Sequence, residues 1–367
     1  MERRNFVKKV GLSGVGMAGI LASGIAPAIA AQPTIRWRLA SSFPSSLDTI
    51  YGAAVVLQQK LSELTGGKFQ IEVSSPGPTQ IVPPFGVVDA VQKGVVECCH
   101  TAGYYYVNKD PVFAMDCTIP FGMDSRQQMA WMYQGNGLKL LREFFDNYNI
   151  VNFPAGNTGT QMGGWYKKPI HSLEDLKGLK MRISTFAGWI VEKMGVKVVN
   201  LPGNKLLSAL ASGEIDAVEW VGPYDDYKLG FYKYAKHYMY PGWWEGQAQL
   251  SLYVNKQAWN SLPKEYQTAV ELASAFSNVN MLAQYDKLNP GALKILLSEK
   301  GVILEPFSNE IMNTAYRYTQ ETYDELYQKN PAWRKIYPDW LEFRNNDALW
   351  FRVAEQSFDN FMRTRKL

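Results

Sequence analysis

The feature that most constrains the fold of this chain is an approximate internal repeat. Residues 90–105, AVQKGVVECCHTAGYY, align without gaps with residues 209–224, ALASGEIDAVEWVGPY. The identical aligned pairs are Ala90 and Ala209, Gly94 and Gly213, Gly103 and Gly222, and Tyr105 and Tyr224. Each copy has the pattern of a helix end, a glycine stop and a strand. The chain is therefore expected to contain two similarly built units.

The same order of elements leads into each copy. In the first unit the pattern predicts strands at 35–40, 69–74 and 95–101 and helices at 47–64 and 85–93. In the second unit it predicts strands at 181–184, 196–201 and 215–220 and helices at 187–194 and 205–211. Alternating strands and helices indicate α/β domains whose ligands bind outside the carboxyl ends of the strands. Two such domains facing each other would share one cleft.

The N-terminal segment has the pattern of an export signal. Residues 1–31 have a basic head, an apolar stretch rich in glycine and alanine, and a small-residue cleavage pattern at 28–30. RRNFVK at 3–8 resembles a twin-arginine signal. A membrane anchor is the alternative, which the glycines, serines and Pro27 disfavour. We expect cleavage and export. Because +3 of the net charge of +4 lies in this segment, nucleic-acid binding is also disfavoured.

The rest of the chain contains no recognisable enzyme or metal motif. Cys98, Cys99 and Cys117 make no disulfide framework and are expected to be buried inert thiols. The three histidines have no metal-ligand or triad spacing, and phosphate-loop, zinc-protease and nucleophile-elbow motifs are absent from the sequence. These observations disfavour an enzyme.

Two places in the second unit have residues suited to binding a small anion. Arg182 lies in the short predicted strand KMRIS, and arginine is the side chain best shaped for bidentate carboxylate recognition. The glycine-dense segment 153–169 also contains Asn157, Thr158 and Gln161, which offer neutral donors and acceptors. The alternatives are a surface strand arginine and a plain crossover loop. We favour a hinge that also lines the cleft.

Two acids next to tryptophans, Glu219 and Glu245, suggest either a general acid/base pair or a cation with oxygen ligands. If both converge with Arg182 and a monocarboxylate in a dry cleft, the net charge is −2. A divalent cation would neutralise that charge, and a monovalent one would halve it. Because a buried unpaired charge costs several kcal/mol, an anionic ligand at such a site calls for a cation. This count of charges favours calcium over sodium without deciding between the two ions.

Several blocks resemble one known family. RWRLASSFP (36–44), GLKMRI (178–183) and GEIDAVEWVGPYDD (213–226) are similar to extracytoplasmic solute-binding proteins of tripartite ATP-independent periplasmic (TRAP) transporters. CHTAGYYYVNKDP (99–111), GNTGTQMGGWY (156–166) and YPGWWEG (240–246) resemble the branch that binds 2-oxo acids and 2-hydroxy acids, typically pyruvate and lactate. The similarity covers essentially the whole mature chain. One departure is SSPGPTQIVPPFG (74–86), which is longer and richer in proline than the usual turn.

The resemblance implies an α/β, two-domain periplasmic-binding-protein-like clamp with mixed sheets, hinge strands and long helices in the C-terminal third. It implies a first domain of residues 32–155 plus about 249–285, a second domain of 156–248, and C-terminal helices at about 286–367 that span both. Such a protein performs no chemistry and delivers its ligand in the periplasm to the transporter's membrane subunits. Some members of this branch form homodimers by exchanging a C-terminal helix, and the aromatic stripe after Trp340 suits such a contact.

The resemblance also implies roles for site residues. Arg182 would pair with the ligand carboxylate. The cation, calcium or sodium, would be held by Gln161, Glu219, Glu245 and the carbonyl of Trp220, and would also contact the ligand. Asn157 and Tyr104 or Tyr105 would complete the pocket. Two other hypotheses stay open: a periplasmic enzyme with Glu219 and Glu245 as an acid/base pair, and a sensory or scaffold protein that reuses the clamp.

Overall fold

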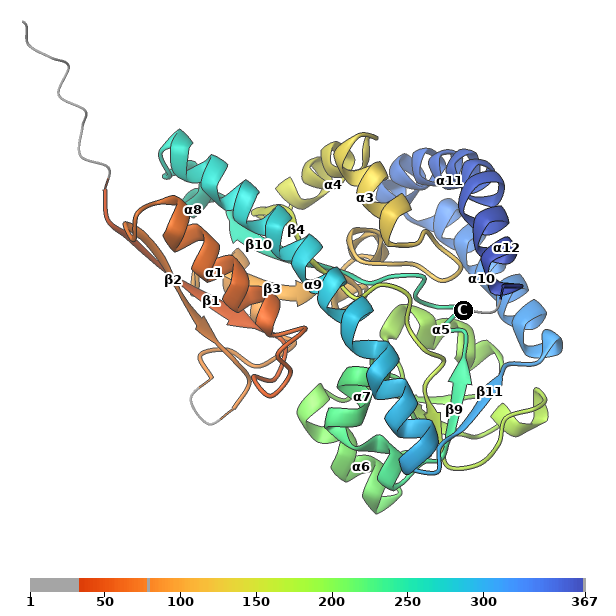
Figure 1. Cartoon of the computed structure of the whole chain (residues 1–367). Coiled ribbons are helices and arrows are strands. Elements are labelled where there is room, and N and C mark those ends of the chain that lie inside the picture. Colours follow the sequence, from red (N-terminus) through yellow and green to blue (C-terminus); the bar gives the residue numbers. More distant parts are fainter. Residues whose placement is uncertain (1–32, 78–79, 366–367) are drawn as a thin grey trace, which may run out of the picture. The chain divides into compact units, whose positions relative to one another are not determined.

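The computed structural model describes residues 33–77 and 80–365. The expected export signal at 1–31 lies outside the described residues. From Thr34 onward the chain folds as one unit built around two sheets (Figure 1). Of the described helices, none combines the length and the apolar character needed to cross a bilayer.

The strands are β1 (Ile35–Ser41), β2 (Phe69–Ser74), β3 (Cys98–Ala102), β4 (Ile150–Asn157), β5 (Trp165–Tyr166), β6 (Lys180–Arg182), β7 (Lys197–Val199), β8 (Ala217–Val218), β9 (His237–Tyr240), β10 (Gln249–Asn255) and β11 (Ile303–Pro306). The main helices are α1 (Gly52–Leu64), α2 (Val87–Gln92), α3 (Ser125–Tyr133), α4 (Gly137–Asp146), α5 (Thr185–Lys193), α6 (Leu206–Ser212), α7 (Pro223–Leu229), α8 (Lys256–Asn260), α9 (Lys264–Glu299), α10 (Asn309–Lys329), α11 (Pro331–Phe351) and α12 (Ser357–Arg363). Short helical turns include η1 (Gly103–Tyr106), η2 (Pro111–Asp116) and η6 (Arg352–Gln356).

Each sheet is mixed. The first has the order β2-β1-β3-β10-β4, in which β10 runs antiparallel to both of its neighbours. The second has the order β11-β9-β5-β8-β6-β7, in which β5 runs antiparallel to β8 and β9. We call the first sheet with its helices the first lobe, and the second sheet with its helices the second lobe. The predicted α/β class with mixed sheets is confirmed.

Two crossover segments join the lobes. The chain leaves the first sheet after β4 and enters the second at β5, and it returns between β9 and β10. The segments, 158–164 and 241–248, bond to each other: Thr158 N donates to Ala248 O at 3.1 Å and Gln161 N to Glu245 O at 3.1 Å. A Cβ added at Gly242 would lie 2.6 Å from the Gln161 carbonyl oxygen, so this approach requires glycine.

The third connection is α9. Its 36 residues span roughly 54 Å at 1.5 Å per residue. It contacts α1 and β4 of the first lobe and α7 of the second, and Figure 1 shows it running past both sheets. The long helices α9, α10 and α11 confirm the prediction of a helical C-terminal third.

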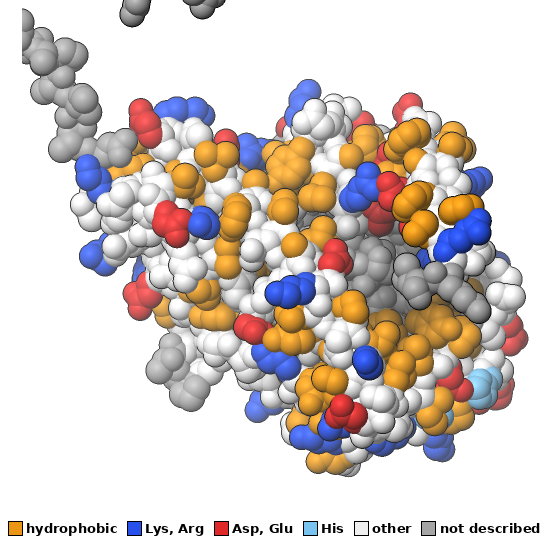
Figure 2. Space-filling model, in the orientation of Figure 1, with side chains coloured by type: hydrophobic (Ala, Val, Ile, Leu, Met, Phe, Trp, Pro, Cys, Tyr) orange, Lys and Arg blue, Asp and Glu red, His pale blue; other side chains and the backbone are white. Residues whose placement is uncertain are grey.

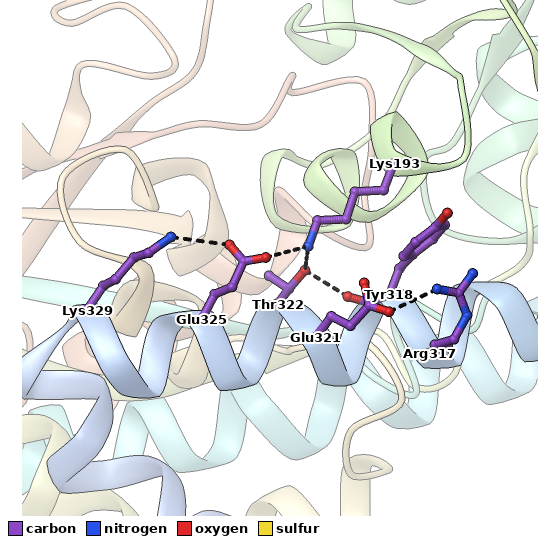
Figure 3. A network of polar contacts seen from close by, with 7 residues as sticks. All are labelled: Lys193, Arg317, Tyr318, Glu321, Thr322, Glu325 and Lys329. Carbon is purple, nitrogen blue, oxygen red and sulfur yellow. Dashed lines mark hydrogen bonds and ion pairs between the residues drawn. The ribbon is translucent and has the colours of Figure 1, made fainter.

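The helix α10 is joined to α5 of the second lobe by a polar network (Figure 3). Lys193 Nζ donates to Thr322 Oγ1 at 2.9 Å and to Glu325 Oε1 at 3.1 Å. Glu325 is about half exposed, so the ion pair itself adds little stability. Apolar packing of Ile311 and Ala315 against the core of the second lobe therefore supplies most of the attachment.

The predicted thiols are buried as expected. Cys98, Cys99 and Cys117 are free and enclosed, and burial raises the pKa of each thiol. The neutral thiol is a weak nucleophile, so these residues serve as small apolar core residues.

The observed elements differ from the predicted ones mainly at strand ends. The predicted strand 215–220 has only two paired residues, β8, because Glu219 and Trp220 leave the ladder for the Gly222-Pro223 turn. The predicted helix 47–64 begins at Gly52, and the preceding residues make a separate turn closed by Tyr51 N donating to Leu47 O at 3.0 Å. Both differences leave side chains free to face the space between the lobes.

A buried acid in the first lobe makes stability depend on pH. Asp116 accepts hydrogen bonds from Asn152 Nδ2 at 2.7 Å and Tyr253 Oη at 2.8 Å. Burial nevertheless raises its pKa from the ordinary 3.8 to about 6. An acid with a raised pKa stabilises the fold when protonated, so its contribution is complete below about pH 4 and is lost as the pH rises through 6.

We expect Asp116→Asn to remove this contribution. Between pH 4 and 7 the free energy of unfolding of the unaltered protein should fall by roughly 2 kcal/mol more than that of the variant. Urea denaturation at each pH measures both values. Asp89→Asn, at an exposed acid of α2, is the control and should follow the unaltered protein. Parallel pH profiles for the unaltered protein and Asp116→Asn would contradict the prediction.

Candidate functional site

A narrow cavity lies between the lobes beside the crossover segments. Its walls are Ile50, Tyr104, Tyr105, Thr158, Gln161, Arg182, Trp220, Val221, Ala248 and Leu250. About 10 Å³ of it is open to the centre of a water molecule, which is room for roughly one water. The walls therefore nearly meet.

Arg182 is the charged residue in these walls. It ends β6, and the pairing of β6 with β8 places it opposite Val218 and thus beside Glu219. Its Nη1 donates to Glu219 O at 2.6 Å and to Glu219 Oε2 at 3.1 Å, and its Nε donates to Leu201 O at 3.2 Å. The two side chains are only 3% and 1% exposed. The sequence did not predict this ion pair.

A second buried acid, Glu245, interacts electrostatically with the same guanidinium. Burial raises its pKa well above the ordinary value, the charge of Glu219 raises it further, and Arg182 lowers it. Burial likewise raises the pKa of Glu219 against the lowering effect of Arg182. Two ionised carboxylates beside one guanidinium leave a net charge of −1. Enclosed in protein, that charge needs either a proton or a cation.

Four oxygens at this place suit a cation. Oε1 and Oε2 of Glu245, Oε1 of Glu219 and Oε1 of Gln161 are buried and have no hydrogen-bond partner among the described residues. Ser184 lowers the pKa of Glu245, but within residues 33–77 and 80–365 no donor reaches hydrogen-bonding geometry to either carboxylate oxygen of Glu245. Buried acceptors are rarely left unpaired, and calcium is held by oxygen ligands. The residues present therefore fit a hard cation.

Carboxylates alone do not complete a cation site here. Within residues 33–77 and 80–365, no group of three or more His, Cys, Asp or Glu side chains is arranged to hold a metal. A cation at this place would need amide or main-chain oxygens in addition to Glu219 and Glu245.

Aromatic side chains enclose the guanidinium. Tyr104 and Tyr105 lie in η1 directly after β3, with their ring centroids 5.0 Å apart. Burial raises the pKa of Tyr105 to about 12 against the lowering effect of Arg182. The ring of Trp220 lies with its centroid 5.2 Å from Arg182 Cζ. These rings exclude water from the charged end of the cavity.

Three predicted site residues, Asn157, Glu219 and Glu245, are not among the walls of the cavity. Of these, Asn157 bonds within the crossover segments. Its Nδ2 donates to Gln247 Oε1 at 2.7 Å, and its Oδ1 accepts from Gly159 N at 2.9 Å. Gln247 in turn donates to Cys117 O at 2.6 Å. These contacts tie the two crossover segments to each other and to the first lobe, so the amide groups serve the connection between lobes.

The lobes also meet away from the cavity. Thr49 Oγ1 of the first lobe donates to Asp225 Oδ1 of α7 at 2.5 Å, and Tyr285 Oη of α9 donates to Asp225 Oδ2 at 2.6 Å. Lys228 of α7 pairs with Asp48 at 2.5 Å. The turn before α1 is thus held against the second lobe from two sides.

Sequence reasoning missed the apolar walls, Ile50, Val221, Ala248 and Leu250. Leu250 belongs to a buried strand, and Val221 follows one, so each has the pattern of an ordinary core residue. Ile50 lies where a helix was predicted. Apolar residues give no signal that separates a cavity wall from a core, because both are buried.

The comparisons with known proteins point to one family. Residues 40–330 match the family described as bacterial extracellular solute-binding protein, family 7. A monocarboxylate 2-oxoacid-binding periplasmic protein of Nostoc sp. is 47% identical over 332 residues, which are 90% of this chain and 90% of that protein.

Solved structures agree with this assignment. A TRAP transporter solute-binding protein from Bordetella bronchiseptica, described as a dimer with calcium and picolinate, is 45% identical with a TM-score of 0.88 over 90% of this chain and 97% of that one. A TRAP periplasmic solute-binding protein from Pseudoalteromonas atlantica with sodium and pyruvate is 35% identical with a TM-score of 0.86, over 91% and 100%. One from Colwellia psychrerythraea with calcium and pyruvate is 33% identical with a TM-score of 0.86, over 89% and 99%.

With the fold, the family match and a relative of 47% identity in agreement, the chain belongs to family 7 of the bacterial extracellular solute-binding proteins.

Proposed function

We propose that this protein binds a small 2-oxo or 2-hydroxy monocarboxylate of the pyruvate or lactate type, together with calcium or sodium, in the cavity between the lobes. It delivers this ligand in the periplasm to the membrane subunits of a TRAP transporter. The observation that carries the proposal is the buried guanidinium of Arg182 in the cavity wall, near buried carboxylate oxygens that have no hydrogen-bond partner in the described part of the chain.

The charges support a ligand pair of one anion and one cation. A cation between Glu219, Glu245 and Gln161 would satisfy the four unpaired oxygens. It would also draw Glu219 away from Arg182 electrostatically, which frees guanidinium donors for a carboxylate. The relatives named with pyruvate also contain sodium or calcium. When bound, the cation supplies positive charge that offsets the carboxylates.

The proposal includes no catalysis. Glu219 and Glu245 have raised pKa values, as a general acid would, but both are enclosed beside Arg182, and we assign them to holding a cation. Membership of a solute-binding family supports this assignment. Recovery of unchanged pyruvate after prolonged incubation tests it, and product formation would favour the acid/base alternative.

The domain limits and the export signal are part of the same proposal. A first domain of 32–155 with about 249–285 and a second of 156–248 are supported by β10 lying in the first sheet and by crossovers at 158–164 and 241–248. Removal of residues 1–31 on export would leave the described lobes whole.

Replacement of Arg182 tests the carboxylate contact. Arg182→Ala removes two charge-assisted hydrogen bonds, each worth about 1.5–3 kcal/mol. The affinity for pyruvate should therefore fall at least roughly 100-fold. Arg182→Lys should be intermediate, because lysine keeps the charge without the planar fork. Calorimetry measures the affinities. Arg38→Ala, at a partly exposed ion pair of the first lobe, is the control. Unchanged affinity in a folded Arg182→Ala protein would overturn the assignment.

Removal of the cation tests the second half of the site. Calcium at 100 times its Kd should raise the free energy of unfolding by about 2.7 kcal/mol, and a chelator should reverse the rise. Glu245→Gln should abolish the effect, because the amide keeps the shape but not the charge. Glu97→Gln, at the ion pair with Arg38, should not change it.

Thermal unfolding measures these changes in stability. A higher melting temperature in sodium chloride than in choline chloride identifies a sodium site. Stabilisation by calcium alone indicates a divalent ion, and stabilisation by sodium alone indicates a monovalent one. Stabilisation by neither ion, with and without pyruvate, would contradict a cation in the site.

A second copy of this chain is the proposed partner of the C-terminal helices. Large apolar side chains are exposed along α11, η6 and α12: Leu349, Trp350, Val353, Phe358 and Phe361. Figure 2 shows apolar side chains gathered on the surface over α11 and α12. Exposed apolar patches of this kind mark interaction surfaces. The structure from Bordetella bronchiseptica is described as a dimer.

We expect Trp350→Glu with Phe358→Glu to produce a monomer. These side chains are 60% and 64% exposed, so the fold should tolerate the charges, whereas an apolar interface should not. Light scattering after size-exclusion chromatography measures the mass. Leu272→Glu in α9, at a side chain 56% exposed, is the control and should leave the dimer intact. A double variant that keeps the dimer mass would exclude this surface.

A further inference from the structure

We infer that Ile50 limits the length of the carbon chain that the site accepts. The inference rests on the proposed function, because it assumes that the ligand is a small 2-oxo or 2-hydroxy acid. Ile50 is an apolar residue of the cavity wall, and it is not one of the residues proposed to bind the carboxylate or the cation.

The cavity walls divide by chemistry. Thr158, Gln161 and Arg182 offer polar groups, whereas Ile50, Val221, Ala248 and Leu250 are aliphatic. A 2-oxo acid divides in the same way, with a carboxylate and a carbonyl at one end and an alkyl group at the other. If the carboxylate is paired with Arg182, the alkyl group is left to the aliphatic walls. Their size then decides which alkyl groups fit.

Ile50 differs from the other aliphatic walls in its place in the fold. Leu250 pairs with Ala102 and Gly156 in the middle of the first sheet, and Ala248 accepts a bond from Thr158 N in the crossover. Val221 directly precedes the turn into α7. These three residues belong to the sheet, to a crossover or to the segment that leads into α7. Ile50 lies in the turn before α1, outside the sheets, so it can vary without changing them.

The contacts of neighbouring residues fix the position of Ile50. Thr49 bonds to Asp225, and Asp48 pairs with Lys228 and accepts from Tyr224 Oη at 3.1 Å. Isoleucine is branched at Cβ, so its χ1 is also restricted. Because these contacts and the β-branch hold Ile50 in place, we expect an alkyl group longer than that of pyruvate to meet its side chain.

The test compares pyruvate, 2-oxobutanoate and 2-oxopentanoate by calorimetry with calcium present. We expect the unaltered protein to lose affinity with each added methylene. Ile50→Ala should raise the affinity for 2-oxopentanoate relative to pyruvate by at least about tenfold, the usual effect of one methylene in an apolar pocket. Ile50→Val should shift the same ratio by a smaller factor.

Ile190→Ala is the matched control. It deletes the same atoms from a fully buried position in the core of the second lobe, which does not line the cavity, and should leave the ratio unchanged. If Ile50→Ala does not fold, the smaller deletion in Ile50→Val decides the question by itself.

The outcomes separate the two proposals. If the unaltered protein binds none of the three acids, the proposed function fails. If it binds pyruvate but both Ile50 variants keep the same ratio between acids, the function stands and the inference about Ile50 is overturned.

Discussion

One buried guanidinium that bonds to one buried carboxyl group and acts electrostatically on a second is the constraint on which the rest of the structure depends. Arg182, Glu219 and Glu245 are enclosed, so water screens none of their charges. Arg182 bonds to Glu219, while both oxygens of Glu245 lack partners among the described residues. Protons can satisfy the excess carboxylate charge, which agrees with the raised pKa values of both acids. A cation can do so as well, and it would prepare the site for an anion.

The connection between the lobes is built around these groups. The crossover at 241–248 contains Glu245, and its bonds to the crossover at 158–164 place Gln161 beside it. On the other side, the short segment from Glu219 to Asp225 contains both a member of the charged group and a residue bonded to Thr49 and Tyr285. The charged site and the contact between lobes therefore share a stretch of seven residues, counted from 219 to 225. A change in the charge of Glu219 would act close to that contact.

The sequence was informative wherever residue type conflicted with an expected environment. Glu219 stands at the end of an apolar predicted strand, where a carboxylate is costly unless it is paired, and it is buried and paired with Arg182. Arg182 is singled out for a different reason, because a guanidinium is suited to bidentate recognition of a carboxylate. The sequence could not indicate that these two residues bond to each other, because the contact depends on the register of β6 with β8. Ile50 is an aliphatic residue at a position expected to be buried, so its residue type gave no indication of a binding site.

By itself the sequence determined the α/β class, the two similar units and the types of charged residue near the strand ends. These follow from periodicity, glycine positions and polarity, which are local properties. Only the tertiary structure decided which polar and charged side chains are paired with each other. It paired Asn157 with Gln247 across the crossovers and bonded Arg182 to Glu219. Among the described residues it left both carboxylate oxygens of Glu245 without a hydrogen-bond donor. The physical reason is that a hydrogen bond or an ion pair depends on distances of a few ångströms between residues far apart in the chain, which no local pattern specifies.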